Sequence, residues 1–529
     1  MNNIRKTLLM NNSIQNLDKW LQKLGNIQVI TDSLEILSSC KNISEFPAVP
    51  PIAILKPQNS EEVEKITNIA NDIKTPLYVY STGKNWGLGS KAIPSSVDSD
   101  YVMVDLSEMR KIHELNLELG YAVIDAGVTQ GQLSEMINKN HSTSFVLNVT
   151  GSSADTSIVG NMLDRGSGVL GNRMEDFLGL EVILGDGTLI KTGLWELYET
   201  KNLKPVHCYT HGIGPDCSHL FFQSNFGIVT KMVVKLRRKV NREAAFILLK
   251  DYNLSDCVDK VRILREEDTL NSIIKIDDIS NDFRFWNDKK SHLQSTSGEF
   301  MITANIHGSE NIISAKKVEI QQRLSSLAKE IIFIKSAEDS DNTSKLFKIT
   351  NAYNKESLAY HFDRFNGHCI DSNVNSLFKL YNKKEFKSSE LDLNSNASGL
   401  VCLVPTIPFC GSSITKVIDI LNKSSKKFDI RPAINFTELD CTSVVGGYIP
   451  LFFNRQSSLE VNTVHAWLKT CFLELERHGF YPQRLDTLNM PDFIKRNEKY
   501  WSKFLKFKKS LDPNNIISPK RYAVHNKLN

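Results

Sequence analysis

The feature that most limits the possible folds is a glycine-rich loop set between predicted strands. Residues 77–80 form a short apolar run after Thr75-Pro76, and residues 81–89 then contain three glycines. A strand pattern follows, over 101–106, where the dinucleotide and mononucleotide loops of familiar α/β folds require a helix. The glycine spacing is Gly-x3-Gly-x-Gly, and Lys84 precedes Asn, not Ser or Thr. Successive main-chain N–H groups here predict either an anion-binding nest or a surface turn.

A second stretch is too poor in large side chains to fill a core. Residues 150–157 are all small or polar, and Ile158 and Val159 are the first apolar residues before Gly160 and Asn161. Such a segment is typical of a long loop, or of a main chain that lies against a flat ligand and offers it N–H groups. Residues 164–168 continue the loop-like composition.

The N-terminal half is predicted to be rich in strands. After a helical lead-in over residues 1–50, Asn59 can cap a helix that carries Val63, Ile66 and Ile69 on one face. Residues 121–126 and 227–234 have strand patterns, with a helix beginning near residue 129. Residues 180–191 read as a hairpin around a Gly-Asp-Gly turn.

The segment from about 241 to 480 changes in character. Phe300 to Ile306 and Leu400 to Val404 are strand patterns, each followed by an amphipathic helix, and Ile449 to Phe453 adds another strand. This recurrence predicts an α+β domain with an antiparallel sheet and helices on one face. The final 40 residues, which include Leu511 to Pro519, are predicted to be rich in turns, with an amphipathic helix over Lys503 to Lys509.

Length and composition narrow the class of protein. A chain of 529 residues with 41% hydrophobic residues has enough material for two to four globular units. The net charge of +4 argues against nucleic acid as the main partner. No apolar run suits a membrane span, and nine scattered cysteines predict a reducing, cytoplasmic location.

Several motifs together resemble the vanillyl-alcohol oxidase and para-cresol methylhydroxylase family, the proteins with a PCMH-type FAD-binding domain. The similar segments run from Ser81 to Gly89, Val159 to Gly166, Gly179 to Gly187 and Phe222 to Lys231, and Leu511 to Pro519 resembles the closing element. The resemblance implies a two-domain α+β fold: an FAD-binding domain over 1–240 (core 50–240), a cap domain over 241–485 and a returning C-terminal segment over 486–529.

The same resemblance implies which residues contact FAD. The loop at 81–89 would hold the pyrophosphate, and the 150–161 stretch would lie beside the flavin ring. The main chain near residues 227–229 would reach the adenine side. The residues implied are Ser81, Thr82, Gly83, Lys84, Asn85, Trp86, Gly87, Gly151, Ser152, Ser153, Ser157, Ile158, Gly160, Asn161, Asp164, Gly227, Ile228 and Val229.

The substrate side matches the family less well. Arg484 aligns with the family's active-site arginine, which stabilises negative charge. Leu88 and Gln483 stand where the family usually has tyrosines, and Ser152 stands where the oxidases have an aspartate. These differences predict a substrate other than a simple para-alkylphenol. Asp155, Asp486 and Tyr448 are the predicted proton-handling residues.

The cofactor is expected to be FAD bound without a covalent link. The strand Gly399 to Pro405 has no His or Tyr at the aligned attachment position, and the 150–161 stretch has no cysteine. Cys402 is expected to be a small core residue.

No metal site is expected. His207, Cys208, His211, Cys217 and His219 have spacings that zinc could use, but this region resembles an ordinary turn of the family. His307, His361 and His368 are weaker candidates for a general base.

We therefore predict an FAD-dependent oxidoreductase that removes a hydride from an alcohol, amine or activated C–H carbon of a small, biosynthetic type of substrate. A 2-hydroxy acid dehydrogenase and a flavin-binding scaffold without catalysis are the alternatives. Oxygen or a redox carrier would accept the electrons, and the chain would form a homodimer without nucleic-acid or membrane partners.

Overall fold

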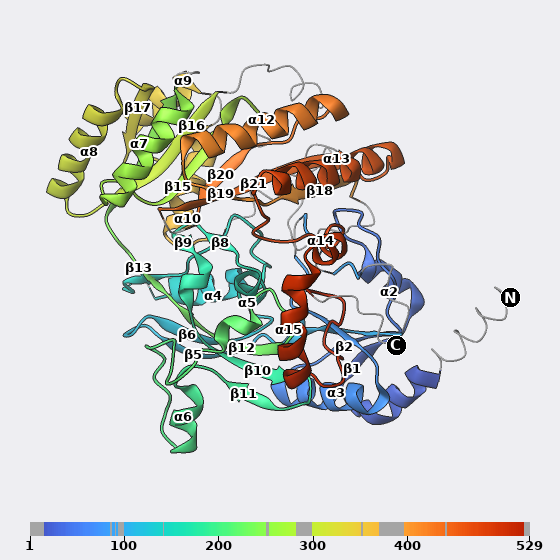
Figure 1. The fold of residues 1–529 in the computed structure, drawn as a ribbon. Helices are drawn as coiled ribbons and strands as arrows, with labels where there is room; N and C mark the ends of the chain where they lie inside the picture. Colours follow the sequence, from blue (N-terminus) through green and yellow to red (C-terminus); the bar gives the residue numbers. More distant parts are fainter. Residues whose placement is uncertain are drawn as a thin grey trace.

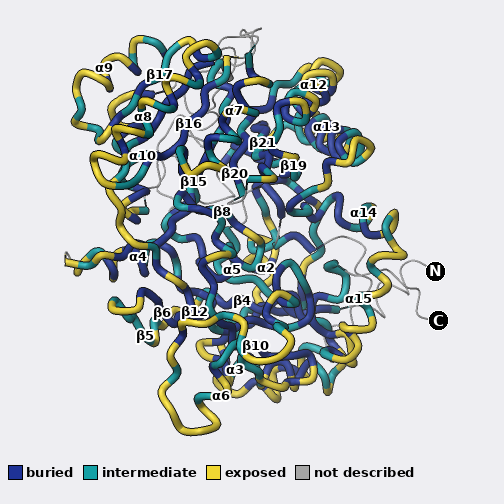
Figure 2. The backbone as a smooth tube through the Cα atoms, turned by 60° about the vertical axis from the view of Figure 1, so that its left-hand side comes forward, coloured by how far each residue is buried: buried dark blue, intermediate teal, exposed yellow. Residues whose placement is uncertain are grey.

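The computed structural model describes residues 15–84, 87–89, 91–93, 100–140, 142–249, 253–281, 299–350, 353–369, 396–439 and 442–522. Figure 1 shows an N-terminal body with a cap above it, and the last two helices lying along the side of that body. Figure 2 shows that buried main chain runs through both parts, while exposed residues gather on the peripheral helices and loops.

Two sheets form the N-terminal body. The first is mainly parallel, and its order is β1 (Gln28–Ile30), β2 (Ala53–Lys56), β4 (Val102–Asp105) and β3 (Leu77–Tyr80). The second is antiparallel, and its order is β11 (Leu189–Lys191), β10 (Phe177–Leu184), β12 (Gly227–Lys235), β6 (Tyr121–Asp125) and β5 (Ile112–Asn116). The lead-in contributes β1 as well as a helix over residues 15–24 and α2 (Ser33–Cys40).

Local sequence explains the first long helix, α3 (Ser60–Ile73). The Asn59 side chain caps it by accepting a hydrogen bond from the Glu62 N–H, and its buried face includes Val63, Ile66 and Ile69. Lys74 ends the helix in the left-handed region, with φ of 60°.

The predicted hairpin is present, since β10 pairs with β11 in antiparallel register. Of the two alternatives for residues 150–161, a loop that continues through residue 161 does not hold. The Ser157 side chain accepts a hydrogen bond from the Gly160 N–H and begins the short helix α5 (Ile158–Leu163). A similar cap at Thr129 begins α4 (Gln130–Asn138).

The cap contains one large antiparallel sheet. Its strand order is β17 (Ala328–Ile334), β14 (Arg242–Leu249), β16 (Phe300–His307), β15 (Asn271–Asp278), β20 (Asn435–Glu438), β21 (Val444–Asn454) and β18 (Ser398–Leu403), with β19 (Thr406–Pro408) also pairing with β21. The α+β fold with an antiparallel cap sheet is therefore confirmed.

Helices cover the outer face of the cap sheet (Figure 1): α7 (Leu254–Glu266), α8 (Glu310–Leu324), α12 (Gly411–Phe428) and α13 (Ser458–Arg477). Strand alternation explains this layer, because Ala245 and Ile247 join the large core cluster beneath these helices. Phe246 and Leu248 point the other way, into a smaller cluster with Leu346 of α9 (Ser340–Ile349) and Leu358 of α10 (Lys355–Phe365).

The C-terminal segment has fewer turns than predicted, although the predicted amphipathic helix over Lys503 to Lys509 is present. Most of residues 490–511 are helical, as α14 (Met490–Arg496) and α15 (Glu498–Leu511), and turns follow only after α15. The chain then extends the first sheet, because Leu77 N–H donates to Ile516 O (2.7 Å) and Ser518 N–H donates to Leu77 O (2.7 Å). Both ends of the chain therefore contribute to the same body.

Candidate active site

A cavity of about 580 Å³ lies between the N-terminal body and the cap. The loop after β3, the 150–164 region and the start of β12 form its lower wall. The cap sheet, helix α10 and residues 517–522 complete it. One enclosure thus brings together segments from both domains and from the C-terminal return.

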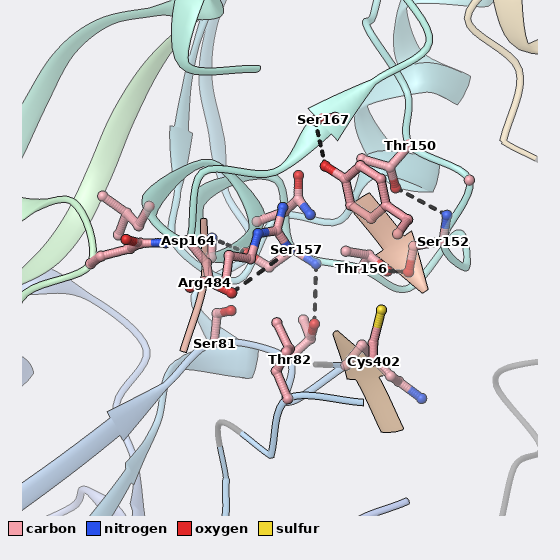
Figure 3. A pocket seen from close by; sticks show the side chains of 18 of the residues that line it. Ser81, Thr82, Thr150, Ser152, Thr156, Ser157, Asp164, Ser167, Cys402 and Arg484 are labelled. Atoms are coloured by element: carbon pink, nitrogen blue, oxygen red, sulfur yellow. Dashed lines mark hydrogen bonds and ion pairs between the residues drawn. The ribbon is translucent and has the colours of Figure 1, made fainter. Parts of the chain in front are cut away.

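The first two glycine- and serine-rich segments contact each other directly at the cavity. Thr82 Oγ1 accepts a hydrogen bond from the Ser157 N–H (3.1 Å), as Figure 3 shows. A Cβ atom added at Gly160 would lie 2.3 Å from Ser81 Oγ, so the close approach of α5 to this loop depends on glycine. Gly83 has φ of +69°, which also favours glycine.

Most of the predicted FAD-contacting residues line the cavity. These are Ser81, Thr82, Gly83, Lys84, Gly151, Ser152, Ser157, Gly160, Asn161, Asp164, Gly227, Ile228 and Val229. Ser153 and Ile158 are instead buried in the N-terminal body, and Gly87 packs against the main chain of Cys402. Asn85 and Trp86 lie outside the described residues.

A group of hydroxyl side chains forms one wall. Ser152 Oγ lies 2.6 Å from Thr156 Oγ1, and the Ser152 N–H donates to Thr150 Oγ1 (3.1 Å). The buried side chain of Gln130 braces this loop by accepting from the Thr150 N–H (3.0 Å) and donating to Ser153 O (2.8 Å). The role of Gln130 was not predicted. The sequence around α4 contains no signal that this side chain contacts a loop 20 residues further along the chain.

Arg484 lines the cavity and is partly anchored. Its Nη2 donates to Arg165 O (2.9 Å), and its Nη1 lies 3.8 Å from Asp164 Oδ2. Its Nε is buried and has no hydrogen-bond partner among the described residues. Burial raises the pKa of Asp164, although the nearby Arg484 opposes that shift. A protonated Asp164 would leave the charge of Arg484 available to a ligand.

Tyr448 also lines the cavity, and a residue of the other domain holds it. Its hydroxyl lies 2.7 Å from the hydroxyl of Ser167 in β8 (Ser167–Gly168), which pairs with β9 (Gly171–Asn172). The Tyr448 hydroxyl also donates to Gln483 Oε1 (3.5 Å). Ser167 itself faces the cavity, and its contact with Tyr448 was missed by sequence reasoning.

Two predicted proton-handling carboxylates are not placed on the cavity wall. Asp486 is buried and accepts hydrogen bonds from the Asn489 main-chain N–H (2.8 Å) and side-chain amide (2.9 Å), so it acts as a turn-stabilising group. Asp155 lies in the loop between the lining residues Ser152 and Thr156 and is absent from the lining. Residue spacing alone could not reveal the direction of either side chain.

The outcomes differ among the other reactive side chains. Cys402 faces the cavity instead of filling the core, and burial raises its pKa to about 11. His361 also lines the cavity, whereas His307 lies at the far end of β16 and His368 contacts Asn138.

The histidine and cysteine residues considered for zinc are dispersed. His207 packs edge-on against Trp195 of α6 (Trp195–Thr200), and His211 pairs with Asp216 (3.1 Å). Within the part of the chain that the structure describes, no three His, Cys, Asp or Glu side chains come together as metal ligands. Over the same residues, no helix is both long and apolar enough to cross a membrane.

The cavity fits a flavin dinucleotide on its own geometry. The Nε atoms of Arg484 and Arg521 are both buried without a partner among the described residues, and both side chains line the cavity. Unpaired buried donors are costly, so their presence favours a ligand rich in acceptor oxygens. Gly151 and Gly160 also line the cavity, and a glycine presents its main chain to a ligand without a side chain in between.

Comparisons with known proteins agree with this fit. Residues 51–193 match the family model described as an FAD binding domain. The chain is 27% identical to the 1'-carboxy-chondrochloren decarboxylase of Chondromyces crocatus, over 94% of this chain and 95% of that protein. It is 31% identical to the flavoprotein subunit of 4-cresol dehydrogenase (hydroxylating) of Pseudomonas putida, over 48% of this chain and 49% of that protein.

A solved structure extends the likeness to the whole fold. The crystal structure of p-cresol methylhydroxylase with substrate bound superimposes with a TM-score of 0.79 and 21% identity, covering 96% of this chain and 97% of that one. The chain therefore contains an FAD-binding domain and has the two-domain fold of p-cresol methylhydroxylase, and the relatives that it resembles include FAD-dependent oxidoreductases.

Proposed function

We propose that this protein oxidises a small organic substrate by hydride transfer from an alcohol, amine or activated C–H carbon, with the substrate held beside Arg484 and Tyr448. The observation that carries the proposal is the position of Arg484. Its anchored Nη2 and unpartnered Nε direct a permanent positive charge into the cavity. FAD, when bound, supplies the two-electron acceptor for such a reaction.

The residues of the chain then divide the remaining work. For an alcohol, oxidation breaks the C–H and O–H bonds, so the hydride leaves with two electrons and a proton leaves the oxygen. Arg484 stabilises the negative charge that develops on the oxygen. Tyr448 is proposed to relay that proton: its hydroxyl takes the proton from the substrate oxygen while it passes its own proton along the hydrogen bond to Ser167 and on to solvent.

For the cofactor we propose contacts from the predicted residues that line the cavity. Ser81, Thr82, Gly83 and Lys84 would hold the pyrophosphate, and the segments at 150–152 and 157–161 would lie beside the flavin ring. Arg521, which sequence reasoning missed, adds a buried cation in the C-terminal segment.

The substrate is proposed to be a specialised one. Leu88 and Ser152 line the cavity, while Gln483 is buried and donates from its amide to Arg165 O (3.2 Å). The three positions thus lack the tyrosines and the aspartate that suit a para-alkylphenol.

An absorption spectrum of the purified protein, followed by an anaerobic substrate screen, tests the proposal. We expect a flavin spectrum that bleaches with a subset of alcohols, amines or benzylic compounds. A flavin that no compound reduces, yet dithionite does, would favour the flavin-binding scaffold.

A carboxylated substrate is the second candidate. The relative that spans nearly the whole chain is named a decarboxylase of a carboxylated compound, and a guanidinium binds carboxylates well. A 2-hydroxy acid dehydrogenase belongs to this candidate. Flavin bleaching by 2-hydroxy acids but not by the matching alcohols would select it.

We propose that FAD is held without a covalent bond. The Cys402 thiol faces the cavity, but its raised pKa of about 11 keeps it protonated and a poor nucleophile. Acid precipitation should release all yellow colour into the supernatant. Colour retained in the pellet of the wild type but not of Cys402→Ser would identify this thiol as the link.

The electron acceptor is proposed to be oxygen or a redox carrier, which stopped-flow reoxidation in air would distinguish.

We also propose a reducing, cytoplasmic setting, because none of the eight cysteines of the described residues is in a disulfide. The oligomeric state is proposed to be a homodimer. Light scattering would report the oligomeric state.

A further inference from the structure

The cap side of the cavity contains a buried arginine whose Nε has no hydrogen-bond partner among the described residues. Arg364 belongs to α10, is 7% exposed and lines the cavity. Its guanidinium carbon lies 4.3 Å from the centroid of the Tyr360 ring. Its Nε is fully buried and has no hydrogen-bond partner, and the guanidinium forms no ion pair with any described residue.

Such an arrangement is unfavourable in the ligand-free protein. A guanidinium stays charged in proteins, so burial cannot be relieved by losing a proton. An aromatic face compensates only part of the lost hydration. Buried charges are normally paired, and one that the described residues leave unpaired favours a ligand as its partner.

The two acidic residues of β15 that line the same cavity already have donors of their own. Asp277 accepts a hydrogen bond from the Asn435 amide. Asp278 accepts from the Ser280 hydroxyl (2.5 Å) and lies 3.6 Å from Arg431 Nη2. Both acids line the cavity, yet neither is an ion-pair partner of Arg364.

The cap sheet explains why this end of the cavity is polar. Along β15, Ile274 and Ile276 pack under the outer helices, so Lys275 and Asp277 point toward the cavity. Thr303 is the register partner of Lys275 on β16 and lines the cavity as well. One turn before Arg364 on α10, His361 faces the same space.

We propose that Arg364 binds a carboxylate on the part of the substrate that lies away from Arg484. This inference rests on the proposed function, because it requires that the cavity binds the substrate. A carboxylate matches the planar donor fork of the guanidinium. A single negative charge also suits a lobe that contains Asp277 and Asp278, where a doubly charged phosphate would be repelled.

Binding of matched probes to the FAD-loaded protein tests the proposal. The probes are 3-phenylpropanoate, its neutral amide and 2-phenylethylphosphonate, followed by calorimetry and by the change in the flavin spectrum. We expect the wild type to bind the carboxylate more tightly than the amide. Arg364→Gln should weaken carboxylate binding by about 10- to 100-fold and leave the amide unchanged.

Arg242→Gln is the matched control. Arg242 is also a cap-domain arginine over an aromatic ring, 4.9 Å from the Phe365 centroid, but it does not line the cavity. This variant should bind all three probes as the wild type does. Equal binding of acid and amide by the wild type, no binding of the acid, or a preference for the phosphonate would overturn the proposal.

Stability provides a readout that does not depend on the probes. Because the unpaired charge is costly, Arg364→Met should melt at the same temperature as the probe-free wild type or higher. Only the wild type should be stabilised by the carboxylate. A lower melting temperature for Arg364→Met would show a structural role instead. Loss of flavin from the wild type itself would contradict the proposed function, not this subsite.

Discussion

The two walls of the cavity differ in which atoms they present to a ligand. The FAD-domain wall consists mainly of main chain and small residues, such as Gly83, Gly151 and Ser157. The cap wall presents long polar side chains, including Lys275 and Arg364. The family model covers only residues 51–193, so it ends before the cap begins. A wall made of main chain can bind the same cofactor in many enzymes, because it depends little on side-chain identity. A wall made of side chains can differ from one enzyme to the next and so select one substrate.

The largest effect is expected at Arg484, which follows the cap helices in the chain but contacts Asp164 and Arg165 of the FAD-binding domain. Arg484→Met should slow flavin reduction by about 100-fold or more, because a positioned charge next to developing negative charge is lost. Rates are compared per bound FAD, because Arg484 also lines the cavity proposed to hold the flavin. Stopped-flow reduction measures the rate, and Arg484→Lys should recover part of it. An unchanged rate in Arg484→Met would remove the arginine from the proposed mechanism.

Tyr448 tests whether the cap contributes to the chemistry as well as to recognition. Tyr448→Phe should reduce the rate of flavin reduction by about 100-fold, as expected when a proton-transfer group is removed. Ser167→Ala removes only its hydrogen-bond partner and should have a smaller effect. Equal rates for Tyr448→Phe and the wild type would assign Tyr448 to packing alone.

Gly160 tests the backbone wall. Gly160→Ala places a methyl group 2.3 Å from Ser81 Oγ, so the loop and α5 must separate. We expect FAD affinity to fall by about tenfold, the equivalent of one displaced hydrogen bond to a charged ligand. Fluorescence titration of the apoprotein with FAD measures this. The double variant Ser81→Gly with Gly160→Ala should regain affinity, and failure to do so would show that another contact limits binding.

Asp164 gives the smallest expected effect, which concerns stability against pH in the FAD-free protein. Burial raises the pKa of Asp164 above that of an unfolded aspartate. Its contribution to folding is therefore complete below about pH 4 and is lost as the pH rises through the folded pKa. Asp164→Asn should thus gain melting temperature over the wild type as the pH increases toward neutrality. A constant difference across pH 4 to 7 would show that Asp164 titrates normally.

The elements predicted from the sequence were those with a strong local pattern. The α3 face with Val63 and Ile66, the hairpin of β10 and β11, and the strands β16 and β21 all have periodicity that a single segment reveals. The short helix α5 was missed because its cap, Ser157, lies in a run of small polar residues that also suits a loop.

The site was predictable only where residues act through their own loop. The segments at 81–84 and 157–161 carry glycines and hydroxyls that indicate a ligand even without neighbours. Asp155 and Asp486 show the limit, because a carboxylate near a site in sequence can point away from it. Arg364 shows the reverse, since nothing in α10 marks one arginine as lacking a partner.

The sequence by itself determined the strongly patterned elements, including the cap strands β16, β18 and β21, because hydrophobic period, caps and glycine content act over a few residues. Only the tertiary structure decided which polar groups meet. Ser167 reaches Tyr448 across 281 residues, and the C-terminal segment completes the sheet beside Leu77. Contacts of that kind depend on how sheets and helices pack. Which charged groups lack a partner among the described residues, such as Arg364, is therefore decided only when the whole chain has folded.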